Sequence, residues 1–426
     1  MADTTASLSL KQDVKIVGLI SGGHFMSHYY TMMLPPLFPL LNADLGVSYT
    51  ALGTLLALKS LASGSTQLPA GILVDKFGAR AILIFGFAMI LLSYFLISFS
   101  HNFWLIGALF MLAGTGNAVF HPADYSIMNG TVSAERMGRS FSAHTFAGHL
   151  GTALAPVMIL TMIGTLGWGW RAAVLASVAV GFFIVIALLT QWSQIQEGDA
   201  KVKKKKAKAA ADGSAPEQTT WQALFEVLSS KPMLFLFLFF ALQALASGGF
   251  KNFAVAGLTE LHGTSLEAAG GALTGFLFAS AFGVLAGGLL ADFDKRHALT
   301  ASAALIITAL IAVIVGSVDL HYTLLVFFFT MAGLVQGIIR PARDMMIRAA
   351  SPKGSIAKSF GFVFSGQAIG GTIAPVAFGM ILDFGAPQWV FYMSAIFMII
   401  CMLAVVGSAR EARKAERAAA ASGIAQ

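Results

Sequence analysis

The sequence predicts an all-α membrane protein with twelve transmembrane helices in two pseudo-symmetric six-helix bundles. Of its 426 residues, 57% are hydrophobic and only 11% are charged, a balance that soluble domains do not have. Many of its apolar runs reach the roughly 20 residues that a helix needs to span a bilayer. Several motifs also recur at an offset of 219 residues, which indicates two related halves.

Twelve apolar segments follow one another, and several exceed the length of a span, which predicts tilted or kinked helices. A polar stretch at 193–231 carries a lysine run at 201–208 and is rich in Gly, Ser, Pro and Ala. We expect a disordered cytoplasmic linker there, with a weakly amphipathic piece at 221–228 on the membrane surface. The predicted domains are an N-terminal bundle, 1–192, and a C-terminal bundle with a cytoplasmic tail, 232–426. The segments are 14–41, 50–73, 81–99, 104–130, 139–166, 171–192, 232–261, 268–291, 298–317, 322–349, 356–382 and 388–408.

Charged residues stand at matching points of two otherwise apolar segments. One carries His121-Pro122-Ala123-Asp124 and the other carries Arg340-Pro341-Ala342-Arg343-Asp344. Burying charge in hydrocarbon is costly, so ionisable residues in spanning helices usually face a cavity or a partner. The two prolines predict kinks in their helices. Two halves that meet around a polar centre are the layout of a transporter.

Positive charge predicts the orientation of the helices. With the N-terminus inside, 22 of the 27 Lys and Arg residues fall in cytoplasmic segments and only Arg171 falls in an outer loop. Under the positive-inside rule both termini are then cytoplasmic, in a multi-pass protein of the inner membrane. The polar N-terminus shows no signal-peptide pattern, so the first helix is expected to act as its own anchor. The lysine run lacks the interleaved aromatics of a nucleic-acid site.

A second repeat, at an offset of 217 residues, relates the first helix pair of each half. The loop after the second helix reads Gly71-Ile72-Leu73-Val74-Asp75-Lys76-Phe77-Gly78-Ala79-Arg80. It resembles the loop signature of the major facilitator superfamily, and the second half keeps a degraded copy at 288–296. The likeness covers the whole chain. It implies the fold of that superfamily, and a loop that stabilises the outward-open state.

The same loop can be interpreted physically as a latch. Gly71 permits close helix packing, Asp75 can cap or pair with a basic group at a neighbouring helix end, and Gly78 relieves a tight turn. Lys76 and Arg80 supply positive charge. The alternative interpretation is a basic loop that only orients the helices.

Buried polar residues are the candidates for substrate binding. Lys59 lies too deep in its helix to reach the surface easily, and Lys251 follows glycines that can loosen the seventh helix. Few carboxylates lie at that depth, so these cations indicate an anion supplied from outside the protein; the alternative is a private ion pair for each. The complete candidate set is His24, His28, Lys59, Asn117, His149, Lys251, Gln336 and Arg340.

Proton coupling is assigned to His121 and Asp124, three residues apart in the fourth segment. In the second half Arg340 and Asp344 can neutralise each other along one helix face, which Arg343 shares. No metal site is expected, although His24 and His28 have a spacing that can bind zinc, because no third ligand with metal spacing is evident. His144 and His149 lie five residues apart and do not share a helix face; of the two, His149 is deeper.

The expected function is secondary transport of a small organic anion, coupled to protons through rocker-switch alternating access. Nothing resembles a Walker motif, and no nucleophile–base or metal constellation predicts an enzyme. One cysteine, Cys401, excludes a disulfide framework and a Cys-ligated metal cluster. No cofactor is expected; the partners are an anionic substrate, protons and the lipid bilayer, with a monomeric chain.

The alternative is a drug/proton antiporter that exports a small phosphonate-like or amphipathic compound. Residues 121–139 and 148–156 loosely resemble fosmidomycin-resistance-type members of the superfamily, which favours export. Drug/proton antiporters commonly carry G-x-x-x-G-P-x-x-G-G in the fifth helix. Here the run from Gly151 to Leu160 keeps a glycine and Pro156 but lacks three glycines, which counts against a drug exporter.

Overall fold

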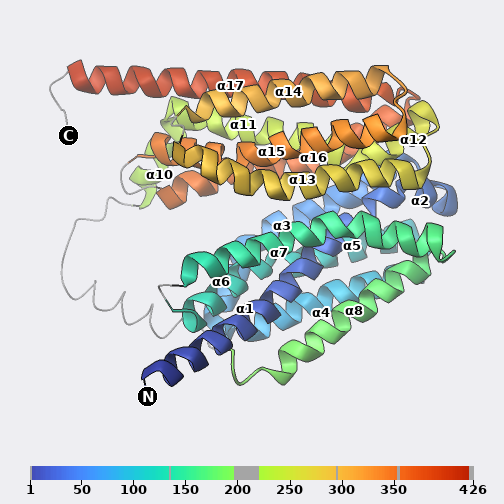
Figure 1. Ribbon diagram of the computed structural model, residues 1–426, viewed down its shortest axis with the longest axis horizontal. Helices are drawn as coiled ribbons and strands as arrows, with labels where there is room; N and C mark the ends of the chain where they lie inside the picture. Colours follow the sequence, from blue (N-terminus) through green and yellow to red (C-terminus); the bar gives the residue numbers. More distant parts are fainter. Residues whose placement is uncertain (1, 134–135, 196–219, 294–295, 353–355, 422–426) are drawn as a thin grey trace. The chain divides into compact units, whose positions relative to one another are not determined.

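Figure 1 shows the computed structural model, which describes residues 2–133, 136–195, 220–293, 296–352 and 356–421. Every regular element in these residues is a helix. The chain divides into two compact units. The first unit holds residues 1–46 and 54–215, and the second holds 47–53 and 216–426. Most of the predicted linker, 196–219, lies outside the described residues.

The predicted fourth segment is interrupted once in the structure. Helix α5 ends at Ala118 and α6 begins at Phe120, shortly before Pro122. Proline removes one backbone hydrogen bond and its ring crowds the carbonyl four residues earlier, which here belongs to Ala118. The helix is therefore interrupted close to the proline at which a kink was predicted. The helices from the N-terminus to this point are α1 (Ala2–Met32), η1 (Pro35–Leu37), α2 (Phe38–Leu45), α3 (Tyr49–Phe77), α4 (Ala79–Ile97), α5 (Phe103–Ala118) and α6 (Phe120–Thr131).

Two further predicted segments contain a π-helical turn. At the end of the fifth segment and within the seventh, five residues adopt the wider π geometry. Proline at position 341, in contrast, lies inside one continuous helix. The remaining helices are α7 (Met137–Leu160), η2 (Thr161–Thr165), α8 (Trp170–Thr190), α10 (Thr220–Ser229), α11 (Lys231–Gly248), η3 (Gly249–Phe253), α12 (Ala254–His262), α13 (Leu266–Phe293), α14 (His297–Ser317), α15 (Tyr322–Ala350), α16 (Ile356–Asp383) and α17 (Gln388–Ala421).

All twelve predicted segments coincide with helical structure. Within the described residues, ten helices are long and apolar enough to cross a membrane. The first two predicted segments, which form α1 and α3, are not among the ten. Their interiors carry His24, His28 and Lys59 together with several Ser and Thr residues. These polar residues lower the hydropathy of α1 and α3, as expected of helices that line a polar interior.

Glycines at the 219-residue offset make equivalent helix contacts in the two units. A Cβ on Gly114 would overlap the backbone carbonyl oxygen of Lys59, and one on Gly333 would overlap that of Phe276. In the same way a Cβ on Gly151 would overlap the carbonyl of Phe25, and one on Gly370 that of Ala241. Small residues let backbones approach closely in membrane helices. The sequence repeat is therefore a repeat of backbone packing.

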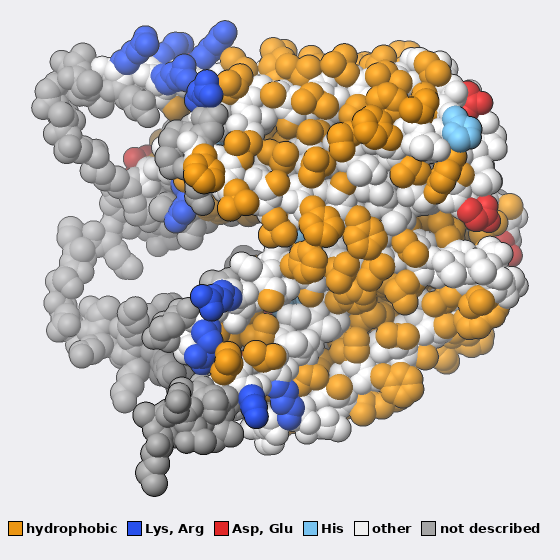
Figure 2. All heavy atoms as spheres, in the orientation of Figure 1, with side chains coloured by type: hydrophobic (Ala, Val, Ile, Leu, Met, Phe, Trp, Pro, Cys, Tyr) orange, Lys and Arg blue, Asp and Glu red, His pale blue; other side chains and the backbone are white. Residues whose placement is uncertain are grey.

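Apolar side chains cover much of the outer face of each unit (Figure 2). Exposed aromatic residues include Trp104, Phe182, Phe183 and Phe293, which a soluble protein would bury but a lipid-facing surface accepts. In the second unit, Lys and Arg side chains gather at the end where α17 finishes, while most of the visible Asp and Glu side chains, and a His, lie at the opposite end. On this face, the end of the unit where α17 finishes is therefore the more basic one.

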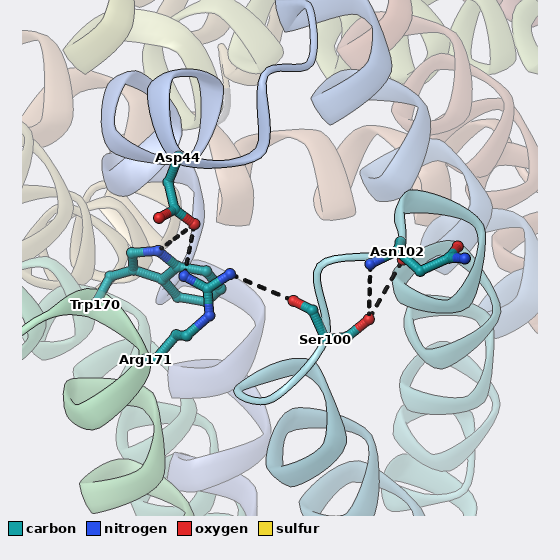
Figure 3. A network of polar contacts seen from close by, with 5 residues as sticks. All are labelled: Asp44, Ser100, Asn102, Trp170 and Arg171. Carbon is teal, nitrogen blue, oxygen red and sulfur yellow. Dashed lines mark hydrogen bonds and ion pairs between the residues drawn. The ribbon is translucent and has the colours of Figure 1, made fainter.

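A polar network joins three parts of the first unit (Figure 3). Arg171, at the start of α8, donates to the Asp44 carboxylate at 2.6 Å and stacks on the Trp170 ring at 4.3 Å. Trp170 Nε1 donates to the same oxygen at 3.2 Å, and Arg171 also donates to the Ser100 carbonyl at 3.4 Å. Asn102 caps α5 through its side chain. The network ties α2 and α8 to the turn between α4 and α5.

Candidate functional site

A cluster of imidazoles lies inside the first unit, where α1, α6 and α7 meet. The His24 ring stacks on His144 with centroids 4.2 Å apart. Two more rings approach His24 edge-on, His28 at 4.6 Å and His121 at 5.2 Å. His24 and His144 are almost fully buried, whereas His121 is exposed. The fold thus gathers four histidines from three helices.

Asp124 projects into this cluster from α6 and is completely buried. One carboxylate oxygen, Oδ2, lies 3.3 Å from His144 Nε2 and 3.7 Å from His24 Nδ1. None of these three atoms, nor Asp124 Oδ1, has a hydrogen-bond partner within the described residues. Buried polar groups usually have partners, so this convergence is the main candidate site of the first unit.

Neighbouring groups hold the rings of this cluster in place. Ser21 Oγ lies 3.4 Å from His144 Nδ1, and His28 Nδ1 lies 3.1 Å from Thr152 Oγ1. Gly148 leaves room for the rings, since a Cβ there would lie 2.6 Å from His24 Nε2. Contacts between α1 and α7 therefore position these imidazoles.

The side chains that contact Asp124 in the structure differ from the one that the sequence suggested. The expected partner was His121, but the recorded contacts of the carboxylate are with His24 and His144. His144 was not in the predicted site. From the sequence, the helix face of His144 can be compared only with that of His149. Whether His144 joins the cluster depends on which face of α7 packs against α1, and the sequence does not show this. His149 is half-buried.

Lys59 lies in the interior of α3 with 7% of its surface exposed. Its ammonium donates to Tyr94 OH at 3.1 Å and to Thr31 Oγ1 at 3.3 Å, and lies 5.6 Å from the Tyr94 ring centroid. The close packing of Gly114 on its backbone fixes the helix at this point. Asn117, on the same helix as Gly114, is half-buried. Lys59 is therefore buried inside the first unit, with two hydroxyl groups as partners.

In the second unit, Lys251 lies in the π-helical turn η3. A π turn is rare and often marks a functional position. Gly249, two residues earlier, packs so closely on α17 that a Cβ would overlap Ser394 Oγ. Lys251 is half-buried. Within the described residues its ammonium makes no hydrogen bond or ion pair. Arg340 lies close enough for the two positive charges to interact.

Arg343, on α15, also contacts Asp344, the partner expected for Arg340. Its Nε lies 3.3 Å from Asp344 Oδ1, and its Nη1 donates to Gln243 Oε1 at 3.3 Å. The guanidinium also covers the Phe240 ring at 4.6 Å. Asp344 therefore pairs with Arg343 and also interacts electrostatically with Arg340, the partner expected from the sequence. Gln336 is buried on the same helix.

The α3–α4 loop carries the predicted latch residues. Gly78 has a φ of 91°, a left-handed value that favours glycine, as expected for a tight turn. Arg80 donates to the Trp192 carbonyl at 2.9 Å and stacks on its ring at 5.0 Å, which ties the loop to the end of α8. Asp75 and Lys76 are exposed. A Cβ on Gly71 would meet nothing within 4 Å, so close packing within the first unit does not explain that glycine.

Comparisons with known proteins give one consistent result. The model of the Major Facilitator Superfamily matches residues 20–255 and 236–425. A fosmidomycin resistance protein of Escherichia coli (strain K12) is 24% identical over 92% of both chains. A "Probable L-galactonate transporter" of the same organism is 30% identical over 34% of this chain and 32% of its own. The crystal structure of a mutant of the nucleoside transporter NupG superposes with a TM-score of 0.76 at 12% identity, covering 93% of this chain and 99% of the other.

Proposed function

Because the chain belongs to the Major Facilitator Superfamily, we propose that it is a secondary transporter of a small organic anion, coupled to protons and working by rocker-switch alternating access. The observation that best supports an anionic substrate is the proximity of Lys251 and Arg340 in the second unit. Two positive charges that repel each other inside a membrane-spanning unit are stabilised by a negative charge between them.

The chemistry of the two cations indicates the class of anion. An arginine offers a planar fork that binds carboxylate, phosphonate or sulfonate oxygens in a bidentate manner. A lysine adds a point charge with three rotatable donors. The relative named for L-galactonate handles a carboxylate of this kind. Lys59 offers a further buried cation in the first unit.

Proton coupling follows from charge balance. Moving an anion into a negative-inside cell costs about 2.3 kcal/mol per charge per 100 mV. A monoanion that enters with one proton carries no net charge, so the membrane potential no longer opposes it; a dianion requires two protons. Coupling to protons is therefore inferred from the charge that crosses the membrane, and not from the titration of one side chain.

The test is flux into liposomes that contain the purified chain. Labelled L-galactonate is compared with L-galactose, which keeps the carbon skeleton and lacks the carboxylate, and with sulfonate and phosphonate probes. We expect accumulation of at least one anion when the interior is alkaline and the membrane potential is clamped to zero. Equal uptake of neutral or cationic compounds would overturn the anion proposal, and anion uptake that ignores the pH gradient would overturn the coupling.

Export of a phosphonate-like compound is the second candidate, since the fosmidomycin resistance protein matches 92% of the chain. The two candidates differ in direction. An antiporter accumulates its substrate in vesicles whose interior is acidic, whereas a symporter does so in vesicles whose interior is alkaline. Measuring a phosphonate under both gradients separates them.

The proposed topology has both termini in the cytoplasm of a cell with an inner membrane. The basic end of the second unit, where α17 finishes, then faces the cytoplasm. Reporters fused within the linker are expected to be cytoplasmic, and those fused near Ala43 or Thr264 periplasmic. The opposite pattern would reverse the topology.

A further inference from the structure

The atoms of three buried side chains converge on one point in the first unit. His24 comes from α1, Asp124 from α6 and His144 from α7. His24 Nδ1, His144 Nε2 and a carboxylate oxygen all lie within 4.8 Å of one another. Three helices thus contribute one potential ligand atom each.

These atoms lack the partners that buried polar atoms normally have. His24 Nδ1, His144 Nε2 and both Asp124 oxygens have no hydrogen-bond partner within the described residues. The side chains are 4%, 1% and 0% exposed for His24, His144 and Asp124, so bulk water does not satisfy them. Such a group of orphaned atoms calls for an ion or an ordered water.

The distances from the carboxylate oxygen to the two nitrogens are close to those between neighbouring ligands of a zinc ion. Bonds of about 2.0–2.1 Å from zinc to nitrogen or oxygen place tetrahedral ligands roughly 3.3–3.5 Å apart. The two imidazole nitrogens lie 3.3 Å and 3.7 Å from Asp124 Oδ2. Hydrogen bonds between nitrogen and oxygen are commonly about 2.7–3.2 Å long.

One outer hydrogen bond and one close backbone approach position the two histidine rings. A ligating histidine normally uses its other ring nitrogen in a hydrogen bond that fixes the ring. His144 does so through Nδ1, which lies 3.4 Å from Ser21 Oγ. Gly148 leaves room for the His24 ring, since a Cβ there would lie 2.6 Å from Nε2.

We propose that His24, Asp124 and His144 bind one divalent transition-metal ion of the zinc class. Imidazole nitrogen with one carboxylate oxygen favours zinc, cobalt or iron over magnesium or calcium, which prefer oxygen ligands throughout. Three protein ligands leave a fourth position open. The site could not be recognised in the sequence, where His24 is paired by its spacing with His28 on the same helix. The other two proposed ligands, Asp124 and His144, come from other helices. The inference does not depend on the transported substrate.

The experiment uses the full chain, purified without a histidine tag, stripped with a chelator and titrated with Co²⁺ and Zn²⁺. We expect one equivalent of Co²⁺ with the visible absorption of a low-symmetry, four- or five-coordinate site. His24→Gln, Asp124→Asn and His144→Gln should each abolish it. His101→Gln, which removes an exposed histidine of the same unit, should bind like the unchanged chain. Ser21→Ala should weaken binding roughly 10-fold, as loss of an outer hydrogen bond to a ligand does.

A second measurement guards against variants that fail to fold. Zinc that binds the folded state raises its melting temperature, so the unchanged chain and His101→Gln should be stabilised by Zn²⁺ and the three ligand variants should not. The assignment is wrong if the unchanged chain binds neither metal, or if binding survives in both Asp124→Asn and His144→Gln. No substrate or proton gradient is present, so this result is independent of the transport assay.

Discussion

Gly114 packs directly on the backbone of Lys59, so closely that a Cβ would overlap the Lys59 carbonyl oxygen. The contact joins α5 to α3 at the level of the buried cation. Because the obstacle is backbone and not a flexible side chain, an added methyl group cannot be accommodated by a rotamer change.

We therefore expect Gly114→Ala to destabilise the protein by about 1–3 kcal/mol, the usual effect of overpacking. Gly18→Ala is the matched control, since a Cβ at that helical position of the same unit would meet nothing within 4 Å. Thermal unfolding in detergent measures both. Equal melting temperatures for the two variants would contradict the packing argument.

The Asp44–Arg171 pair predicts a pH-dependent contribution to stability. Burial alone would raise the pKa of the Asp44 carboxyl, but hydrogen bonds from Arg171 and Trp170 outweigh it and hold the pKa below its usual value of 3.8. The carboxylate therefore stabilises the fold fully above that value, and the effect disappears as the pH falls through the lowered pKa. The Asp44 side chain is 38% exposed, so we expect at most about 1 kcal/mol.

Arg171→Gln tests this expectation. The difference in melting temperature between this variant and the unchanged chain should be full at neutral pH and shrink toward zero as the solution is acidified below pH ~4. Asp44→Asn should behave as Arg171→Gln does at neutral pH. A difference that persists unchanged in acid would assign the role of Arg171 to its stacking on Trp170.

The proposed anion site predicts unequal effects of two substitutions. Arg340→Lys keeps the charge but loses the bidentate fork, so we expect weaker anion binding, by roughly 10-fold for one charged hydrogen bond. Lys251→Met should weaken binding further because it removes a charge. Lys414→Met, which removes a surface charge of the same unit, is the control. Binding is measured by thermal shift with a panel of anions; an Arg340→Gln variant that binds like the unchanged chain would exclude Arg340.

The loop between α3 and α4 predicts a change in conformational equilibrium. If it stabilises the outward-open state, Asp75→Asn should shift the population toward inward-open and leave the melting temperature nearly unchanged, since Asp75 is exposed. Cysteines introduced one at a time report accessibility from each side. The only natural cysteine, Cys401, is buried, so background labelling is small. Identical labelling in Asp75→Asn and the unchanged chain would favour a loop that only orients the helices.

Much of the fold was predictable because it depends on local patterns and on a repeat. Segment lengths and hydropathy indicated all twelve helical stretches. The offset of 219 residues predicted the equivalence that Gly114 and Gly333 now show as backbone contacts. Pro122 predicted a break, and the helix is interrupted at Val119.

The site was less predictable because helix faces meet only in three dimensions. A helical wheel shows that His144 and His149 point apart, but it does not show that the His144 face meets α1 and α6. The contact between Arg343 and Asp344 is likewise unexpected, since neighbouring residues on a helix do not face each other; the long arginine side chain folds back to reach the carboxylate.

The π-helical turn at Gly249–Phe253 also affects how this chain can be compared with others. Such a turn closes on the fifth residue instead of the fourth, so it holds one residue more than the α-helical turn it replaces. Against a homologue with a regular helix, the alignment therefore needs a one-residue gap inside the membrane. If the gap is placed in the next loop instead, each residue between the turn and that loop is aligned with a residue of the homologue that is one position off. One position corresponds to about 100° around the helix. The gap must therefore be placed correctly before one can decide whether a homologue has a cation at the position of Lys251.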